Sequence, residues 1–353
     1  MDVEGDLEAV FATFWPLIDS GEWRSIRGTA RLLRLLRRLP VPPYRTGRER
    51  AASPAGRTHS IDRDEQAVRF HYDVSNDFYQ LWLDSRMQYS CGYFEQPDVD
   101  LDTAQSAKLE HICRKLRLSP GDRLLDIGCG WGGLLEYAAE HYGVSGLGVT
   151  LSEPQAAEAN ERFERAGLAD WTRAEVCDYR RLDGEFDAIV SVGMVEHVGR
   201  AQLREYCGQA FKLLRPGGVF LLHGITSKWE ERPGPMDPFI ARYVFPDGEL
   251  TPISELLGHA ESAGFEVRDV ENLREHYAAT LRHWVRNLEA HRDEAVALTD
   301  DITYRIWRLY MTGCAYNFER GGIGVCQSLL HKPTGGHSTL PPTRADWYAD
   351  AGL

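Results

Sequence analysis

A glycine-rich turn between a predicted strand and a predicted helix constrains the fold of this chain more than any other feature. The turn reads Asp126-Ile-Gly-Cys-Gly-Trp-Gly-Gly133, at the end of the apolar run 123–127, and a helical pattern begins near Leu134. Glycine has no Cβ, so the backbone can turn tightly and approach a ligand closely. In doubly wound sheets, ligands bind in the crevice outside the carboxyl ends of the strands. The turn therefore predicts an α/β fold with a ligand at that edge.

Short β-rich runs alternate with helical patterns from about Leu124 to Val270, which is typical of a doubly wound parallel sheet. The predicted strands are branched, apolar and bounded by turn residues; they cover 123–127, 145–150, 186–192 and 219–222, with 172–176 as a weaker candidate. A stretch rich in proline and aromatic residues follows at 229–250, and residues 276–316 have a mostly helical pattern. We expect these later segments to form a helical cap over the ligand end of the sheet.

The glycine turn also satisfies the dinucleotide-binding pattern GxGxxG, so two kinds of cofactor must be compared. Asp126 stands two residues before the first glycine, an arrangement found in methyltransferases. The second predicted strand ends in Gly148-Val-Thr-Leu-Ser152, where a dinucleotide site would have an acidic residue for the ribose. We therefore predict S-adenosylmethionine as the cofactor, with a dinucleotide site and a purely structural turn as the alternatives.

Composition and charge exclude several classes of protein. The formal net charge is −13, which argues against a nucleic-acid binder that works through bulk charge. The seven cysteines show neither CxxC pairs nor zinc-ligand spacing, so we expect no metal site and no disulfide framework, as suits a reducing cytoplasm. No signal peptide and no apolar stretch long enough to span a bilayer is recognisable. We expect a cytoplasmic protein, soluble or peripherally attached to the inner face of the membrane.

A basic segment near the N-terminus differs in composition from the rest of the chain. Between residues 23 and 50 arginine is dense and acidic residues are almost absent. Five arginines recur at steps of three and four and so share one helical stripe: Arg24, Arg27, Arg31, Arg34 and Arg38. A basic amphipathic helix over residues 23–39 suits anionic lipid headgroups, but it could equally dock on the acidic body of this protein.

These patterns divide the chain into three parts. Residues 1–64 are predicted to hold the basic amphipathic helix and a linker, and residues 65–332 to form the cofactor-binding domain with its cap. The tail at 333–353 contains clusters of Gly, Ser and Pro, and we expect it to be disordered.

Several motifs outside the glycine turn occur in a fixed order along the chain. They are His71-Tyr-Asp73 with Asn76 and Phe78, Tyr89-Ser-Cys-Gly-Tyr-Phe94, Leu125 to Gly133, Gly148 to Ser152, and Val195-Glu-His-Val-Gly199. Over about residues 65–332 the sequence closely resembles the cyclopropane-fatty-acid synthase and mycolic acid cyclopropane synthase family. The resemblance implies a Rossmann-like methyltransferase sheet, a helical lipid-binding cap and, here, a short N-terminal helical extension. It also implies transfer of a methyl group from S-adenosylmethionine to a cis double bond of an acyl chain.

The resemblance further implies a set of cofactor contacts. Tyr89 and Ser90 should face the methionine end, and Gly128 and Gly130 should lie beneath it, beside Asp126. The ribose and adenine contacts would be Thr150, Leu151 and Gln155, with Asp178 and Tyr179 at the adenine edge. The plainer interpretation is that Tyr89 is a core aromatic residue and Asp178 a turn residue.

A methylated alkene is a carbocation, so the enzyme must remove a proton from it within a protected site. Family members bind a bicarbonate ion for this purpose, and the matching positions here are Cys91, Glu196, His223, Ile225 and Tyr277. The resemblance implies that Cys91 and Ile225 donate through backbone amides, that His223 and Tyr277 donate or relay hydrogen bonds, and that Glu196 orients the ion or takes its proton. Glu196 and His223 follow two predicted strands, so both should reach the crevice of the glycine turn.

Other interpretations of the site remain open at this level. Four aromatic residues are candidates for stabilising the cation or are core residues: Tyr243, Phe245, Tyr316 and Phe318. The acceptor could be an unsaturated phospholipid at a membrane surface, a mycolic-type acid on a carrier protein, or an acyl thioester. The alternatives are a methyl- or methylene-branched product, a small-molecule C-methyltransferase, and a catalytically silent protein that binds lipid or cofactor. The sequence leaves the oligomeric state open, with a homodimer as one option.

Overall fold

The computed structural model describes residues 5–19, 25, 29–30, 34, 51–52, 54–72, 74–228 and 237–348. The predicted basic helix at residues 23–39 lies almost wholly outside these residues, as does Asp73 of the first family motif. Within the described residues, no helix combines the length and the apolar character that a membrane span requires.

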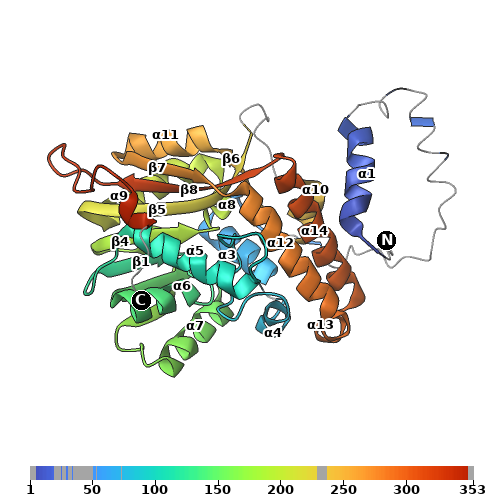
Figure 1. Ribbon diagram of the computed structural model, residues 1–353, viewed down its shortest axis with the longest axis horizontal. Coiled ribbons are helices and arrows are strands. Elements are labelled where there is room, and N and C mark those ends of the chain that lie inside the picture. The colour runs from blue at the N-terminus through green and yellow to red at the C-terminus, as the bar shows by residue number, and fades with distance from the viewer. Residues whose placement is uncertain are drawn as a thin grey trace.

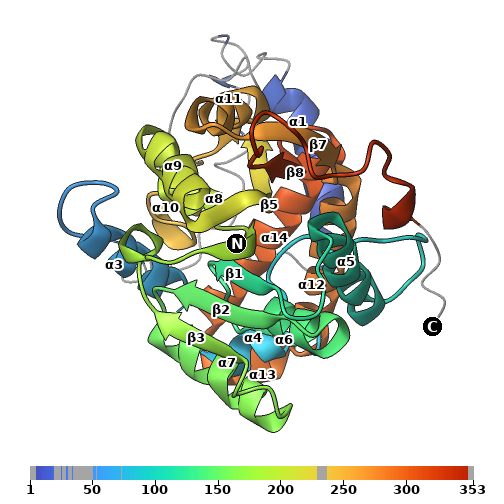
Figure 2. The same cartoon turned by 90° about the vertical axis from the view of Figure 1, so that its left-hand side faces the viewer.

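A single sheet forms the centre of the described molecule (Figures 1 and 2). Its strand order is β3-β2-β1-β4-β5-β8-β7, and β6 pairs with β5 outside this path. Strands β1 to β6 pair in parallel, whereas β8 is antiparallel to both β5 and β7. The strands are β1 Arg123–Ile127, β2 Ser145–Thr150, β3 Thr172–Val176, β4 Phe186–Val192, β5 Leu214–Ser227, β6 Thr251–Pro252, β7 Glu266–Asn272 and β8 Gly324–His331.

The predicted α/β class is confirmed, and the weaker strand candidate at 172–176 is also a strand. The candidate at 219–222 is only the centre of β5, which extends over Leu214–Ser227. The sequence did not predict β8, which follows the helical cap. Its partner β5 lies about a hundred residues earlier, so no local pattern indicates the pairing.

Two layers of helices cover the sheet because its strands are apolar on both faces. Leu124 and Leu125 are neighbours on β1 but belong to different cores, since successive side chains of a strand point to opposite faces. One core contains residues of α5 Leu101–Leu116, α6 Gly133–Tyr142 and α7 Glu153–Arg165. The other contains residues of α8 Val195–Val198, α9 Leu203–Leu213 and α11 Ile253–Ala263. Short 3₁₀ turns lie at Tyr179–Arg181, Arg200–Gln202 and Ala345–Trp347.

The helical cap lies beyond one end of the sheet (Figure 1). It contains α12 Arg274–Ala290, α13 Arg292–Leu298 and α14 Asp301–Glu319, together with α10 Pro238–Tyr243 and α4 Asn76–Gln80. A third apolar core, rich in aromatic side chains, holds it together. Two further helices lie in the N-terminal region, α1 Leu7–Asp19 and α3 Ile61–Tyr72. Helix α3 spans the predicted domain boundary between residues 64 and 65, so that boundary is placed too late.

The prediction of a disordered tail is wrong as far as residue 348. Trp347 is only 3% exposed, and the Lys115 ammonium group lies 5.7 Å from the centre of its ring. Arg114 on α5 donates a hydrogen bond of 3.2 Å to the Trp347 carbonyl oxygen. The composition of the tail suggests disorder, but one large aromatic side chain with cationic neighbours gains enough from burial to order it.

Candidate active site

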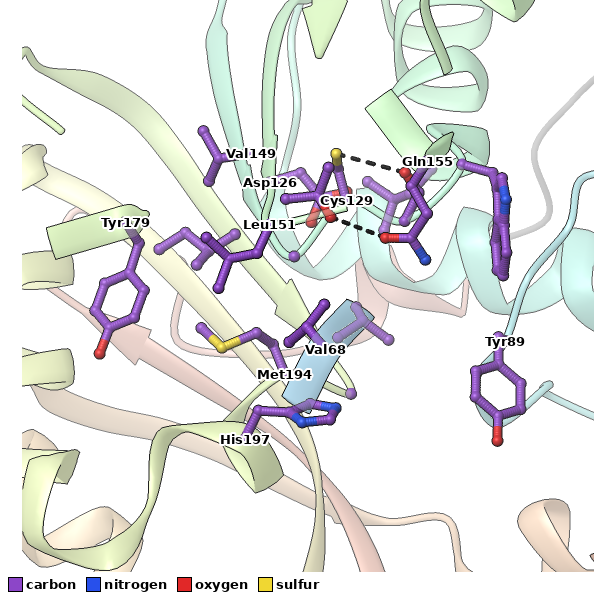
Figure 3. Close-up of a pocket in the computed structure, with 18 of the residues that line it drawn as sticks. Val68, Tyr89, Asp126, Cys129, Val149, Leu151, Gln155, Tyr179, Met194 and His197 are labelled. Carbon is purple, nitrogen blue, oxygen red and sulfur yellow. Dashed lines mark hydrogen bonds between the residues drawn. The ribbon is translucent and has the colours of Figure 1, made fainter. Parts of the chain in front are cut away.

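The cofactor cleft lies at the carboxyl ends of β1, β2 and β4 (Figure 3). Tyr179 and Tyr89 lie at opposite ends of the view, with Asp126 and Leu151 between them. All the residues predicted to bind the cofactor line this one cavity: Tyr89, Ser90, Asp126, Gly128, Gly130, Thr150, Leu151, Gln155, Asp178 and Tyr179. Segments that are far apart in the sequence are thus brought to one edge of the sheet.

Two glycines of the turn are required by close packing. Gly128 has a φ of 89°, and a Cβ there would lie 2.9 Å from the side chain of Met194. A Cβ on Gly133 would lie 2.4 Å from the carbonyl oxygen of Arg86. A positive φ and contacts below 3 Å both exclude ordinary side chains. The glycine pattern therefore serves the packing of the turn as well as access for a ligand.

Asp126 lines the cleft and is 3% exposed, and its Oδ1 has no hydrogen-bond partner among the described residues. Burial raises the pKa of this carboxyl group to about 7, although the Lys108 ammonium group opposes the shift. Lys108 is fully buried on α5 and donates hydrogen bonds to Gln88 Oε1 (2.6 Å) and Ser90 Oγ (3.0 Å). A buried carboxyl oxygen without a partner indicates a site that a polar ligand completes.

The end of β2 carries hydroxyl and amide groups where a dinucleotide site would carry an acid. The Thr150 hydroxyl donates a hydrogen bond of 2.8 Å to Gln155 Oε1. The Ser152 hydroxyl caps the following helix by accepting a hydrogen bond from the backbone N–H of Gln155. Asp178 both lines the cleft and caps a 3₁₀ turn. Its carboxylate binds the Arg180 guanidinium, which also donates to Asp64 on α3 at 2.9 Å. Asp178 is thus a turn residue and a lining residue at once.

A second cavity, of about 490 Å³, lies between the sheet and the cap. Aromatic and aliphatic side chains form most of its wall, among them Phe245, Tyr310, Leu281 and Phe318. Helix α1 adds Phe11 and Trp15, which pack against Tyr316 on α14 with ring centroids 6.2 and 6.1 Å apart. We call this space the acyl cavity, because its mostly apolar wall suits a hydrocarbon chain.

The cofactor cleft and the acyl cavity meet at Tyr89 and Gly193, which line both. The Tyr89 ring is held by aromatic neighbours, with centroids 5.2 Å from Trp284 and 5.5 Å from His71. His71 in turn lies 3.8 Å from the ring of Phe245, on the acyl side. A methyl group bound in the cleft and a chain bound in the cavity would therefore face each other at this junction.

Glu196 lines the acyl cavity and is 4% exposed. Its Oε1 accepts a hydrogen bond of 2.6 Å from the backbone N–H of Ile225, and its Oε2 has no partner among the described residues. Burial raises the pKa of Glu196 to about 7, although the Ile225 amide opposes the shift. The expectation that the Ile225 amide is free to bind an anion is therefore corrected, because that amide is held by the neighbouring carboxylate.

His223 and Cys91 lie deeper, and neither is among the residues that line the acyl cavity. His223 Nδ1 lies 3.2 Å from Gln327 Nε2, and His223 Nε2 has no partner among the described residues. Burial lowers the pKa of His223 to about 3, so the imidazole is neutral. Burial also raises the pKa of the Cys91 thiol, which donates to the Leu273 carbonyl oxygen at 3.6 Å. A Cys91 thiolate is thus strongly disfavoured.

The remaining predicted residues divide between the cavity and its surroundings. Tyr277 lines the acyl cavity and packs against Phe318 with ring centroids 4.6 Å apart. Of the four candidate aromatic residues, Phe245 and Phe318 line the cavity. Tyr243 packs with Phe239 on α10, and Tyr316 packs against α1, so neither of these two lines it.

Sequence reasoning missed several buried polar residues around the site. Lys108 and Lys115 are fully buried on α5, and Gln327 is fully buried on β8. For α5 the sequence did contain a sign of buried charge, because two lysines seven residues apart occupy the apolar stripe of that helix. Nothing local marks Gln327, since its partner His223 is 104 residues away.

Comparison with known proteins assigns the family. The model of the mycolic acid cyclopropane synthetase family matches residues 59–328. The chain belongs to this family. A probable fatty acid methyltransferase of Pseudomonas putida is 51% identical over 301 residues, which cover 84% of this chain and 76% of that protein. Cyclopropane mycolic acid synthase 3 of Mycobacterium tuberculosis is 38% identical over 276 residues, 75% of this chain and 96% of that family member.

Solved structures of the family have the same fold. The mycolic acid cyclopropane synthase CmaA1, complexed with SAH and CTAB, is 37% identical and superposes with a TM-score of 0.72 over 76% of this chain and 98% of that one. The cyclopropane synthase MmaA2 of Mycobacterium tuberculosis gives the same TM-score at 36% identity, over 76% and 98% of the two chains. This chain is therefore an S-adenosylmethionine-dependent methyltransferase of a lipid-modifying family, and the prediction of that cofactor is confirmed.

Proposed function

We propose that this methyltransferase adds a methyl group to a cis double bond of an unsaturated acyl chain and closes a cyclopropane ring with the help of a bound bicarbonate. One observation carries the proposal. The cofactor cleft meets a large apolar cavity at Tyr89, and a buried carboxyl group, Glu196, lies in the wall of that cavity. A hydrocarbon acceptor, a methyl donor and a proton acceptor can thus meet at one junction.

The chemistry explains why enclosure is needed. S-adenosylmethionine, when bound, supplies an electrophilic methyl group on a sulfonium centre. The alkene is a weak nucleophile, and its attack on this methyl group leaves a positive charge on the acyl chain. Water would trap that cation, whereas the apolar wall excludes water, and the faces of Phe245 and Phe318 can stabilise the charge. One C–H proton must then leave as its electron pair closes the ring.

The residues around Glu196 fit a small oxyanion. Two of the proposed ion ligands each have one buried side-chain atom without a partner among the described residues, Glu196 Oε2 and His223 Nε2. Glu196, His223 and Tyr277 would hold the ion together with the backbone amide of Cys91, and the Ile225 amide would join only if the Glu196 carboxyl group turned away from it. Bicarbonate, when bound there, would supply the base for the proton. Glu196 has its pKa raised to about 7, so near neutral pH its carboxyl group can accept or return a proton.

A second product class has a specific observation in its favour. The Pseudomonas putida relative, 51% identical to this chain, is named a fatty acid methyltransferase. The same cation gives a methylene-branched chain if a 1,2-hydride shift first moves the charge to the methylated carbon and a methyl proton is then lost. A hydride donor that reduces this methylene group would give a methyl-branched chain. A small-molecule C-methyltransferase is disfavoured by the extent of apolar wall in the acyl cavity.

The experiment that separates these products is incubation with methyl-labelled donor and unsaturated phospholipid, followed by NMR of the extracted lipid. The cyclopropane gives ring CH₂ signals, whereas a methylene branch gives vinylidene signals; mass alone does not decide, because both products add one CH₂. Vinylidene signals without ring signals would replace the cyclopropane proposal by the second product class. Turnover on soluble aromatic acceptors, with none on lipid, would reject both.

We further propose that the acceptor is a phospholipid acyl chain, taken up at the surface of an anionic membrane on the cytoplasmic side. The arginine stripe at residues 23–39 supports this proposal through its charge pattern. The acyl cavity supports it through its apolar wall, which an acyl chain would fill.

A further inference from the structure

A row of polar side chains crosses the sheet behind the acyl cavity. Gln327 on β8 is the register partner of His223 on β5 and of Glu271 on β7. Directly paired residues of neighbouring strands place their side chains on the same face of the sheet. Two residues of α5, Lys115 and His111, contact this row at its Glu271 end, where both bind the Glu271 carboxylate.

Most of the row is closed to water, whereas the Glu271 side chain at one end is 23% exposed. Lys115 and Gln327 are fully buried, His223 is 1% exposed, and the Trp347 ring lies over the Lys115 ammonium group. Burial opposes ionisation of Glu271, yet His111 and Lys115 hold its pKa down to about 2. The ammonium group and the carboxylate therefore form a fixed ion pair at one end of the row, with His223 at the other end.

The ion pair decides how the Gln327 amide is oriented. Lys115 Nζ lies 2.9 Å from Gln327 Oε1, and an ammonium group can only donate hydrogen bonds. The oxygen of the amide must therefore face Lys115, and the amide NH₂ group faces His223 Nδ1 at 3.2 Å. An amide NH₂ group can also only donate, so His223 Nδ1 must accept. The reverse orientation would place two sets of donors against each other.

We propose that Gln327, oriented by Lys115, is a positioning residue that holds His223 in the neutral Nε2–H tautomer, so that His223 donates one hydrogen bond into the deprotonation site. The family resemblance implies that His223 either donates a hydrogen bond to the ion or relays one through its ring. With Nδ1 occupied as an acceptor, relay through the ring is blocked and only the donor role remains. The catalytic meaning of this donor rests on the function proposed above, whereas the tautomer itself does not.

The tautomer can be measured directly in the full chain, without a turnover assay. Protein labelled with ¹⁵N-histidine is studied by long-range ¹H–¹⁵N correlation, and the His223 signals are identified by their absence in His223→Gln. We expect the pattern of a neutral imidazole with its proton on Nε2 throughout pH 6 to 8. A proton on Nδ1, or the averaged shifts of an imidazolium, would overturn the proposal. This measurement needs only the wild type and the assignment variant.

Two variants test the positioning role. Gln327→Glu places an acceptor opposite Nδ1 and should move the proton of His223 to that nitrogen. Since supporting partners of catalytic groups typically contribute ten- to hundredfold in activity, kcat should fall by about that factor while affinity for S-adenosylmethionine is retained. Lys115→Met frees the amide to rotate and should give a mixture of both tautomers. Gln202→Glu, which makes the same charge change in a 3₁₀ turn away from the row, should leave the His223 spectrum unchanged.

The outcomes distinguish this inference from the proposed function. If the Nε2–H pattern is found but His223→Gln and Glu196→Gln turn over at the wild-type rate, the tautomer assignment holds and the proposed deprotonation site fails. If the Nδ1–H pattern is found while both variants lose turnover, the site holds and the inference fails. An unchanged His223 spectrum in Gln327→Glu, with unchanged kcat, would reduce Gln327 to a packing residue.

Discussion

The backbone N–H of Ile225 donates a hydrogen bond of 2.6 Å to Glu196 Oε1 and thereby fixes a buried carboxyl group in the wall of the acyl cavity. The contact takes up one oxygen and leaves Oε2 without a partner among the described residues. The carboxyl group is thus held in place and still has one oxygen available to an ion or a proton.

Glu196→Gln should impair turnover far more than donor binding. The glycine turn meets the donor in the ground state, whereas Glu196 acts on the proton that leaves later, so its loss should appear in kcat. General-base assistance is typically worth 10² to 10⁴ in rate, and kcat should fall by about that factor. Affinity for S-adenosylmethionine, measured by calorimetry, should stay near the wild-type value. A correctly folded variant with wild-type turnover and product would move the base elsewhere.

The pH dependence of kcat should carry the titration of Glu196. Because burial raises its pKa to about 7, the carboxylate form is lost as pH falls below 7, and kcat should decrease about tenfold for each pH unit below that value. The pKa of His223 is lowered to about 3, so His223 should contribute no change between pH 5 and 8. Glu196→Gln should abolish the inflection near pH 7. A flat wild-type profile from pH 5.5 to 8.5 would contradict the role of Glu196.

Asp126→Asn should weaken donor binding and stabilise the ligand-free protein above pH 7. The pKa of Asp126 is raised to about 7 in the folded state, so its protonated form is stable there and the wild type loses stability as pH rises from about 4 to 7. Removing the charge should recover at most about 4 kcal/mol, a figure that already includes the opposing interaction with Lys108. Scanning calorimetry at pH 8 should show a higher Tm. Normal affinity of Asp126→Asn for S-adenosylmethionine together with a lower Tm would contradict this account. If the wild type bound NAD and did not respond to S-adenosylhomocysteine, the assignment of the cofactor would be wrong.

Helix α1 lies before residue 59, where the family match begins, yet it contributes to the acyl cavity. Trp15→Ala should raise KM for the acyl acceptor by up to about thirtyfold, because burying an aromatic side chain against the chain is worth roughly 2 kcal/mol. The change in kcat should be small, since Trp15 does not line the cofactor cleft. Thr13→Ala, an exposed position on the same helix, is the matched control. Equal KM values for the two variants would show that α1 does not contact the acceptor.

The segment at residues 23–39 should give salt-sensitive binding to anionic vesicles. Five arginines on one stripe would each contribute about 1 kcal/mol near the surface, and this attraction is screened as the Debye length falls to about 3 Å at 1 M salt. Flotation with anionic and with neutral vesicles measures the effect. Unchanged vesicle binding and activity after removal of residues 1–50 would show that the segment docks elsewhere or has no role.

Local patterns in the sequence were sufficient for much of the parallel part of the sheet and for the glycine turn. Largely apolar runs predict β1, β2, β4 and the centre of β5, because a strand buried on both faces needs such residues at most positions. The glycine turn predicts the cleft because only glycine tolerates the φ of 89° at Gly128 and the backbone contact at Gly133. Glu196 and His223 became candidate site residues through the family resemblance that the ordered motifs carry.

Only the tertiary structure decided which partners those residues have. The pairing of His223 with Gln327 depends on an antiparallel strand 104 residues away, and the ordering of Trp347 depends on buried cations of α5. The Ile225 amide is occupied because Glu196 happens to reach it, and Phe11 joins the acyl cavity because α1 packs on α14. Such contacts arise between segments that are distant along the chain, where local propensity has no influence. The sequence by itself therefore determined the chemistry that is present, and the packing determined which groups are free to perform it.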